Sequence, residues 1–246
     1  SWIENGKRIA FLAGGNIWAM NADGTARVQL TTTGDIEGYK FSPDGKKVIL
    51  VKSMPFNEII KKNPDDLPKA SGRRVTDLMY RHWDHYVESI QHPYVADVTE
   101  NGITGGADIL NGEPFECPME PFGGMEQIAW SVDSKSIAYT CRKKTGRDYA
   151  ISTDSDIYLY NVETGATKNL CKEDGYEPVV VDATKTMKAQ RVNSEENLKN
   201  NPGYDTNPQF SPDGKYVAWQ SMARDGYEAD RNRLCVYELT TGEKTY

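Results

Sequence analysis

Residues Asp225–Asp230, with the sequence DGYEAD, place an aromatic side chain and several carboxylates in one short loop. A carboxylate beside an aromatic ring suits a ligand with a free amine, because a charge-assisted hydrogen bond fixes the ligand's orientation. We predict that Tyr227, Glu228 and Asp230 contact such a ligand. The alternative is that these acids are solvated, or that they pair with neighbouring arginines, namely Arg224, Arg231 and Arg233.

A second group of polar and aromatic side chains lies in residues 77–88, DLMYRHWDHYVE. Arg81, Trp83 and Asp84 are the second set of candidate ligand-binding residues. We expect a short helix in this segment.

The three histidines, His82, His85 and His92, fall within eleven residues. On a helix, His82 and His85 would share one face, which is compatible with metal binding. The aromatic and basic neighbours favour packing instead, since metal ligands need a fixed scaffold. We therefore predict no metal site, and nothing in the sequence calls for a cofactor.

A serine nucleophile of the GxSxG type is absent from the sequence. None of the 21 glycines is followed by Ser two positions later. The tight strand-to-helix turn that presents such a serine needs small neighbours. We predict that the chain holds no catalytic residues.

Charge and hydropathy exclude two classes of partner. The formal net charge is −7, without a long run of either sign, so nucleic acid is not an expected partner. No apolar stretch approaches the ~18 residues of a membrane span. Four cysteines without CxxC spacing favour buried thiols, although three disulfide pairings remain open.

A repeat dominates the remaining sequence. It consists of an aromatic residue, Ser, turn formers and a β-rich stretch, and occurs as YKFSPDGKKVILV, IAWSVDSKSIAYT and PQFSPDGKYVAWQ. In Ser-Pro-Asp-Gly, Pro presets φ, Asp bonds the backbone downstream and Gly takes the left-handed conformation. The middle copy has Val132 for Pro and Ser134 for Gly, so we expect a looser turn there.

Each repeat continues into a third strand, a hairpin signal and a short fourth strand. Such units in tandem predict an all-β fold, an incomplete β-propeller of about four four-stranded antiparallel blades. We expect one partial propeller domain over residues 1–246, with insertions at about 54–91 and 172–204. The first blade is expected to lack its innermost strand, and the last to stop within its fourth strand.

Several longer segments carry a family resemblance. DLMYRHWD from Asp77, SDIYLYNVETG from Ser155 and the stretch Gly203–Leu234 resemble the N-terminal propellers of prolyl oligopeptidase family serine peptidases. The likeness is to bacterial dipeptidyl peptidases and acylaminoacyl-peptidase-like enzymes. The shorter SPDG motif is similar in periplasmic propellers such as TolB.

The resemblance implies a C-terminal α/β-hydrolase domain, which this chain lacks, as the chain's partner. It implies a secreted or periplasmic enzyme that removes dipeptides or acylated residues from peptide N-termini. The chain would restrict and orient the peptide substrate. The alternative is a TolB-like module that binds a protein or peptide. A family propeller has seven or eight blades, so this fragment could dimerise through open blade edges.

Overall fold

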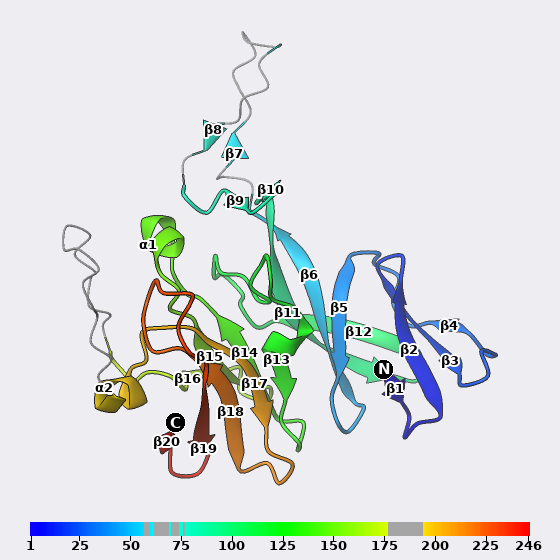
Figure 1. Cartoon of the computed structure of the whole chain (residues 1–246). Helices are drawn as coiled ribbons and strands as arrows, with labels where there is room; N and C mark the ends of the chain where they lie inside the picture. The colour runs from blue at the N-terminus through cyan, green and yellow to red at the C-terminus, as the bar shows by residue number, and fades with distance from the viewer. Residues whose placement is uncertain (57–59, 62–68, 70–73, 76, 177–193) are drawn as a thin grey trace. The chain divides into compact units, whose positions relative to one another are not determined.

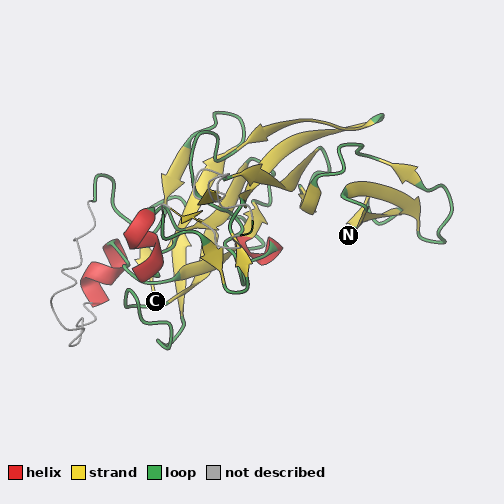
Figure 2. Ribbon diagram, turned by 90° about the horizontal axis from the view of Figure 1, so that it is seen from above, coloured by secondary structure: helices red, strands yellow, loops and turns green. Residues whose placement is uncertain are grey.

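The computed structural model describes residues 1–56, 60–61, 69, 74–75, 77–176 and 194–246, and most elements in these residues are strands. Figure 2 shows the few helical pieces among them. The chain divides into two compact units, Ser1–Met125 and Glu126–Tyr246, which are described separately below. The single domain expected over residues 1–246 stays a prediction. None of the described helices is long and apolar enough to cross a membrane.

The first sheet of the N-terminal unit has the strand order β1-β2-β3-β4 (Figure 1). Its strands are β1 (Trp2–Ile3), β2 (Arg8–Ala13), β3 (Asn16–Asn21) and β4 (Val28–Gln29). The expectation that this sheet lacks its innermost strand is wrong. Glu4, Asn5 and Gly6 all have positive φ, and this tight turn lets Trp2 pair with Ile9.

The second sheet of this unit has the order β12-β11-β6-β5. Its strands are β5 (Ile36–Phe41), β6 (Lys47–Pro55), β11 (Ser89–Thr99) and β12 (Gly102–Asp108). β6 and β11 stay paired as far as Pro55 and Ser89, so both strands extend into the segment expected as an insertion. The rest of that segment holds β7 (Ile60–Lys61), β8 (Arg74–Val75), β9 (Arg81–His82) and β10 (His85–Tyr86), with residues outside the described part between them.

The prediction of a helix in residues 77–88 is wrong. β9 and β10 form an antiparallel hairpin in which His85 pairs with His82 and Tyr86 with Arg81. Trp83, at the tip, has a φ of 41°, in the left-handed region that a right-handed helix excludes. The turn therefore reverses the chain where a helix would continue.

The C-terminal unit holds the other two four-stranded sheets, each with its strands in chain order. The third sheet contains β13 (Ile128–Trp130), β14 (Ser136–Cys141), β15 (Asp156–Asn161) and β16 (Thr167–Asn169). The fourth contains β17 (Asp205–Phe210), β18 (Tyr216–Ser221), β19 (Arg233–Glu238) and β20 (Lys244–Thr245). The predicted fold class is confirmed: the chain is all-β, and its described residues form four four-stranded antiparallel sheets of the propeller-blade type.

Short helical segments lie outside these sheets. They are η1 (Met125–Gln127), α1 (Gly146–Ile151) and α2 (Ser194–Lys199). The second expected insertion, 172–204, includes α2, whereas its residues 177–193 lie outside the described residues.

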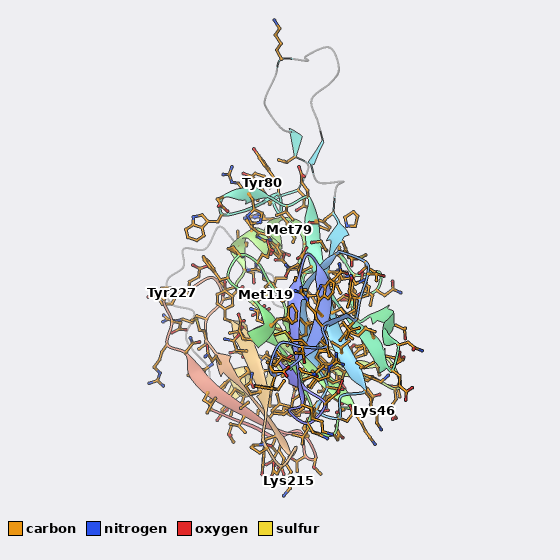
Figure 3. All side chains as sticks on the ribbon, turned by 90° about the vertical axis from the view of Figure 1, so that its right-hand side faces the viewer. Lys46, Met79, Tyr80, Met119, Lys215 and Tyr227 are labelled. Carbon is orange, nitrogen blue, oxygen red and sulfur yellow. The ribbon has the colours of Figure 1, made fainter. Side chains whose placement is uncertain are left out.

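The three repeat turns share one hydrogen-bond pattern. In each, the Ser hydroxyl donates to the Asp two positions later, at 2.6–2.7 Å; the pairs are Ser42–Asp44, Ser131–Asp133 and Ser211–Asp213. The prediction that the middle turn is looser is wrong. Ser134 adopts a φ of 63°, and its amide still donates to the Ser131 carbonyl oxygen. Figure 3 shows Lys46 and Lys215, which follow the first and third turns, near the ends of their sheets.

Each unit has a core formed by two neighbouring sheets. In the N-terminal unit, Ala10 and Ile17 of the first sheet pack with Ile36, Val48 and Leu50 of the second. In the C-terminal unit, a second cluster joins the third and fourth sheets; its members include Ala138, Ile157, Leu170, Val217, Trp219 and Tyr237. Burial of these side chains stabilises each unit by roughly 1.5–3 kcal/mol per large residue.

We predict that Gly15→Ala destabilises the chain more than Gly24→Ala. Both glycines have positive φ, so both substitutions carry the same kind of backbone strain. A Cβ at Gly15 would lie 2.1 Å from the Gly34 carbonyl oxygen, whereas a Cβ at Gly24 meets nothing within 4 Å. Overpacking of this kind costs about 1–3 kcal/mol. Urea unfolding should show that difference, and equal losses in the two variants would contradict the described contact.

Candidate functional site

Residues 222–232 connect β18 to β19, and an ion pair fixes their path. Arg224 donates from Nε and Nη2 to the two oxygens of Asp230, at 3.1 and 2.9 Å. The backbone amides of Ala223 and Arg231 donate to the same carboxylate. The hydrogen bond from Arg224 is the main cause that lowers the pKa of Asp230 to about 2. Asp230 is therefore ionised and already bonded within its own loop.

The base of the loop is fixed to the segment that precedes β15. Asp225 accepts from the Ser152 hydroxyl at 2.8 Å and from the Thr153 amide at 2.7 Å. The Gly226 amide donates to the Thr153 hydroxyl at 2.9 Å. The Asp225 carboxylate is therefore already bonded, and Asp225, like Asp230, has a structural role.

Tyr227 and Glu228 occupy the outer part of this loop. The Arg224 guanidinium carbon lies 4.0 Å from the centre of the Tyr227 ring, a cation–π contact that orients the ring. Tyr227 is 43% exposed, and Figure 3 shows it at the edge of the C-terminal unit. Glu228 is exposed, and within the described residues it forms no hydrogen bond or ion pair. Of the three predicted residues in this loop, Glu228 is the one with an available carboxylate.

The second predicted group lies on the β9–β10 hairpin of the N-terminal unit. Arg81 Nε donates to the Trp83 carbonyl oxygen at 2.9 Å, and its guanidinium lies 5.5 Å from the Tyr86 ring centre. The Trp83 ring packs against Phe122 with centroids 5.4 Å apart. These two rings are 75% and 79% exposed, so they form an open aromatic surface. The two predicted groups belong to separate units, and each is described as a separate site.

The histidines of the hairpin bind carboxylates. His85 lies between Asp84 and Glu120, with nitrogen–oxygen distances of 3.1 and 3.0 Å. These hydrogen bonds raise the pKa of His85, and the bond to His85 lowers the pKa of Asp84. The buried His82 Nε2 lies 3.0 Å from Glu116 Oε2. The histidines thus connect the hairpin to Glu116 and Glu120.

A buried polar cluster in the C-terminal unit was missed by the sequence analysis. Asp205, at the start of β17, accepts from Trp219 Nε1 at 2.6 Å and from Asn201 Nδ2 at 2.8 Å. Its backbone amide donates to the Ser155 carbonyl oxygen at 3.0 Å, which links the third and fourth sheets. Burial raises the pKa of Asp205 to about 7.

Asp156 and Cys171 lie beside Asp205, with one potential metal-ligand atom from each residue within 4.8 Å of the others. The Lys172 ammonium group, however, binds Asp156 and also Asp154, the latter at 2.8 Å. Because a lysine side chain already supplies the positive charge, we interpret the cluster as a structural one. Asp156 and Asp205, each the first residue of an otherwise β-forming stretch, were the sequence signal that could have indicated it.

All four cysteines are buried free thiols, as the sequence favoured. Burial raises the pKa of Cys171 and raises that of Cys235 to about 12. Cys171 and Cys235 therefore remain protonated at neutral pH, and a protonated thiol is a poor nucleophile.

Comparison with known proteins matches this chain to relatives named dipeptidyl-peptidase 5. Dipeptidyl-peptidase 5 of Porphyromonas gingivalis is 47% identical over 251 residues, a match that covers the whole chain and 33% of the relative. The Porphyromonas endodontalis enzyme of the same name is 46% identical over 239 residues. The chain is homologous to one third of dipeptidyl-peptidase 5. No family model matches the sequence.

Solved structures agree with this fold. An acylaminoacyl peptidase from Pyrococcus horikoshii matches the whole chain with a TM-score of 0.56 at 14% identity, over 31% of its own length. Dipeptidyl peptidase 4 of Porphyromonas gingivalis matches with a TM-score of 0.50 at 14% identity, over 31% of its length. A putative TolB from Agrobacterium tumefaciens gives 0.50 at 13% identity, over 58% of its length. These likenesses show the fold. The resemblance to dipeptidyl peptidases stated from the sequence is confirmed by the identity to dipeptidyl-peptidase 5.

We predict that the stability of the chain falls as pH rises from about 4 to about 7, and that Asp205→Asn reduces this slope. The folded chain holds a proton on Asp205 up to about pH 7, whereas the unfolded chain releases it near 3.8. The folded state thus binds the extra proton in this window, and one such group contributes up to about 1.4 kcal/mol per pH unit. Melting temperatures between pH 4.5 and 7.5 measure the slope.

Asp213→Asn is the control for this experiment. Hydrogen bonds lower the pKa of this exposed aspartate, so it titrates below the window. Its variant should keep the wild-type slope. A slope that is unchanged in Asp205→Asn would contradict the protonated state of Asp205.

Proposed function

We propose that this chain is the propeller part of a dipeptidyl peptidase and that it orients the free N-terminus of a peptide. The observation that carries the proposal is the exposed Glu228, which follows the exposed Tyr227 in the chain on a loop whose other acids are bonded. The chain spans about a third of the length of the relatives it matches. The rest of the enzyme, a C-terminal α/β-hydrolase domain, would supply the serine nucleophile.

Removal of a dipeptide requires that the enzyme measure two residues from the peptide's N-terminus. A carboxylate that binds the α-ammonium group provides this fixed point, since the bond is strong and directional. Binding at one end of the substrate then places the scissile carbonyl at the nucleophile, which is a contribution of orientation. In this proposal Glu228 binds the amine, and Tyr227 contacts the first part of the peptide.

Asp230 has a positioning role in this proposal. Its pairing with Arg224 brings the guanidinium under the Tyr227 ring, so the ion pair determines where Tyr227 and Glu228 lie. Because its oxygens already accept from Arg224 and two backbone amides, Asp230 acts on the ligand through its neighbours.

The β9–β10 hairpin is a second proposed binding surface, which lies in the N-terminal unit. Trp83, with Phe122, offers exposed aromatic area to an apolar side chain of the peptide. Arg81 and Asp84 hold the hairpin through Trp83 and His85. We further propose that the blades restrict access so that short peptides enter, that the enzyme is periplasmic or secreted, and that open sheet edges allow dimerisation.

We predict that the 246-residue chain alone has no peptidase activity. It lacks a GxSxG serine, so a chromogenic dipeptide substrate should not turn over and a serine-reactive phosphonate should not label it. A longer protein that also contains the hydrolase domain should cleave the substrate and react with the phosphonate. Labelling of the 246-residue chain above background would refute the division of roles.

We predict that Glu228→Gln in the longer enzyme weakens the use of substrates with a free amine. Loss of a hydrogen bond between charged groups should lower kcat/KM by roughly ten- to a hundredfold. The measurement compares a dipeptide substrate with its N-acetylated form.

Glu163→Gln is the matched control, because Glu163 is also an exposed acid in a turn of the C-terminal unit. This variant should keep the wild-type kcat/KM for both the free and the N-acetylated substrate. Equal losses on free and acetylated substrates in Glu228→Gln would show that Glu228 does not bind the amine.

A further inference from the structure

A hollow of about 520 Å³ lies in the C-terminal unit, away from the Glu228 loop. Its lining comes from β16, the end of α2 and the strands β19 and β20. Four lysines contribute to this lining: Lys168, Lys172, Lys199 and Lys244. The Glu228 loop enters β19 at Arg233, whereas the hollow lies near Tyr237 toward the other end of that strand. The hollow is thus a candidate site separate from the one proposed above.

Lys168 reaches a phenol rather than a carboxylate. Its ammonium donates to the Tyr237 hydroxyl at 3.0 Å and lies 5.7 Å from the centre of that ring. Among the described residues no carboxylate lies within 4.0 Å of it. The Tyr237 hydroxyl, which accepts from Lys168, can still donate its own hydrogen to a ligand.

Lys244 faces the same tyrosine, since the two residues are paired across β19 and β20. Its ammonium donates to the carbonyl oxygens of Cys171 and Lys199, at 2.7 and 2.8 Å. Both acceptors are neutral, and no ion pair to Lys244 is formed within the described residues. Burial lowers the pKa of Lys244, which shows the cost of holding this cation without an anion.

The other charges of the hollow largely balance one another. Lys172, together with Lys144, neutralises the pair Asp154 and Asp156. Lys199 lies 3.8 Å from Glu173, which is also in the lining. Asp174 remains, and its charge acts on Lys168 at longer range. Lys168 and Lys244 are therefore two positive charges in the hollow that form no ion pair within the described residues, and Asp174 acts on Lys168 only at longer range.

We propose that this hollow binds an oxyanion, either a phosphate group or a carboxylate group of a small molecule or peptide. Lys168 supplies the charge, the Tyr237 hydroxyl donates a hydrogen bond, and Lys244 adds its remaining N–H group. Lys168 is exposed and Lys244 is partly buried, so an oxyanion can reach Lys168 from solvent and form a charge-assisted hydrogen bond with it. The bound anion would also neutralise Lys244 and so stabilise the contact between α2 and β20.

The test is a calorimetric titration of the 246-residue chain with inorganic phosphate at pH 7.5 and constant ionic strength. We expect saturable binding to the wild type, and an affinity at least about tenfold lower for Lys168→Gln. Lys199→Gln should weaken binding less, because the Lys199 ammonium group already lies near the Glu173 carboxylate. Lys135→Gln removes an exposed lysine outside the hollow and should bind phosphate as the wild type does.

A parallel titration with citrate distinguishes the two sources of the oxyanion. Tighter binding of phosphate assigns the site to phosphate groups, and tighter binding of citrate assigns it to carboxylates. Circular dichroism of each variant verifies that the chain is folded. Absence of saturable binding for both anions, or equal affinity in Lys168→Gln and Lys135→Gln, would overturn the proposal.

Discussion

Each four-stranded sheet of this protein is too small to cover its own apolar residues, and this constraint determines the rest of the structure. A sheet reaches stability only when a neighbouring sheet covers its face. In the C-terminal unit, Ile157 and Leu170 of one sheet pack against Val217 and Trp219 of the next. Asp205 adds a polar link, because its amide binds Ser155 of the third sheet and its carboxylate binds Trp219 of the fourth.

This packing fixes the ends of the strands, and the strand ends hold the loops. Residues 222–232 start where β18 ends and stop where β19 begins, so the core beneath them determines their position. Within the loop, Arg224, Asp225 and Asp230 are bound to one another or to the segment before β15. Rigid support of this kind is what the binding role proposed for Glu228 requires, since orientation is lost when the supporting residues move.

The repeat was predictable from sequence because its turn chemistry is local. Ser, Asp and Gly at fixed positions determine the turns after Phe41 and Phe210, and the strands follow by alternation. Two local expectations failed for identifiable reasons. Ser134 tolerates the left-handed conformation that was reserved for glycine, and Trp83 takes that conformation at a position expected to be helical.

The candidate site was predictable only as a set of residues. The sequence placed Tyr227, Glu228 and Asp230 in one loop and offered pairing with neighbouring arginines as the alternative to ligand binding. It could not show which of the acids Arg224 binds, and the structure shows that this acid is Asp230. That pairing depends on how the loop folds back on itself. The polar cluster around Asp205 was missed because its members come from positions 50 residues apart, joined only when two sheets pack.

The central claim is that this frame presents Glu228 to the amine of a peptide. A crystal structure of the chain with a dipeptide bound tests it most directly. The account predicts the amine nitrogen within about 2.7–3.2 Å of a Glu228 oxygen, with the Tyr227 ring against the first residue. A dipeptide whose amine lies at another carboxylate, with Glu228 left in solvent, would contradict the account.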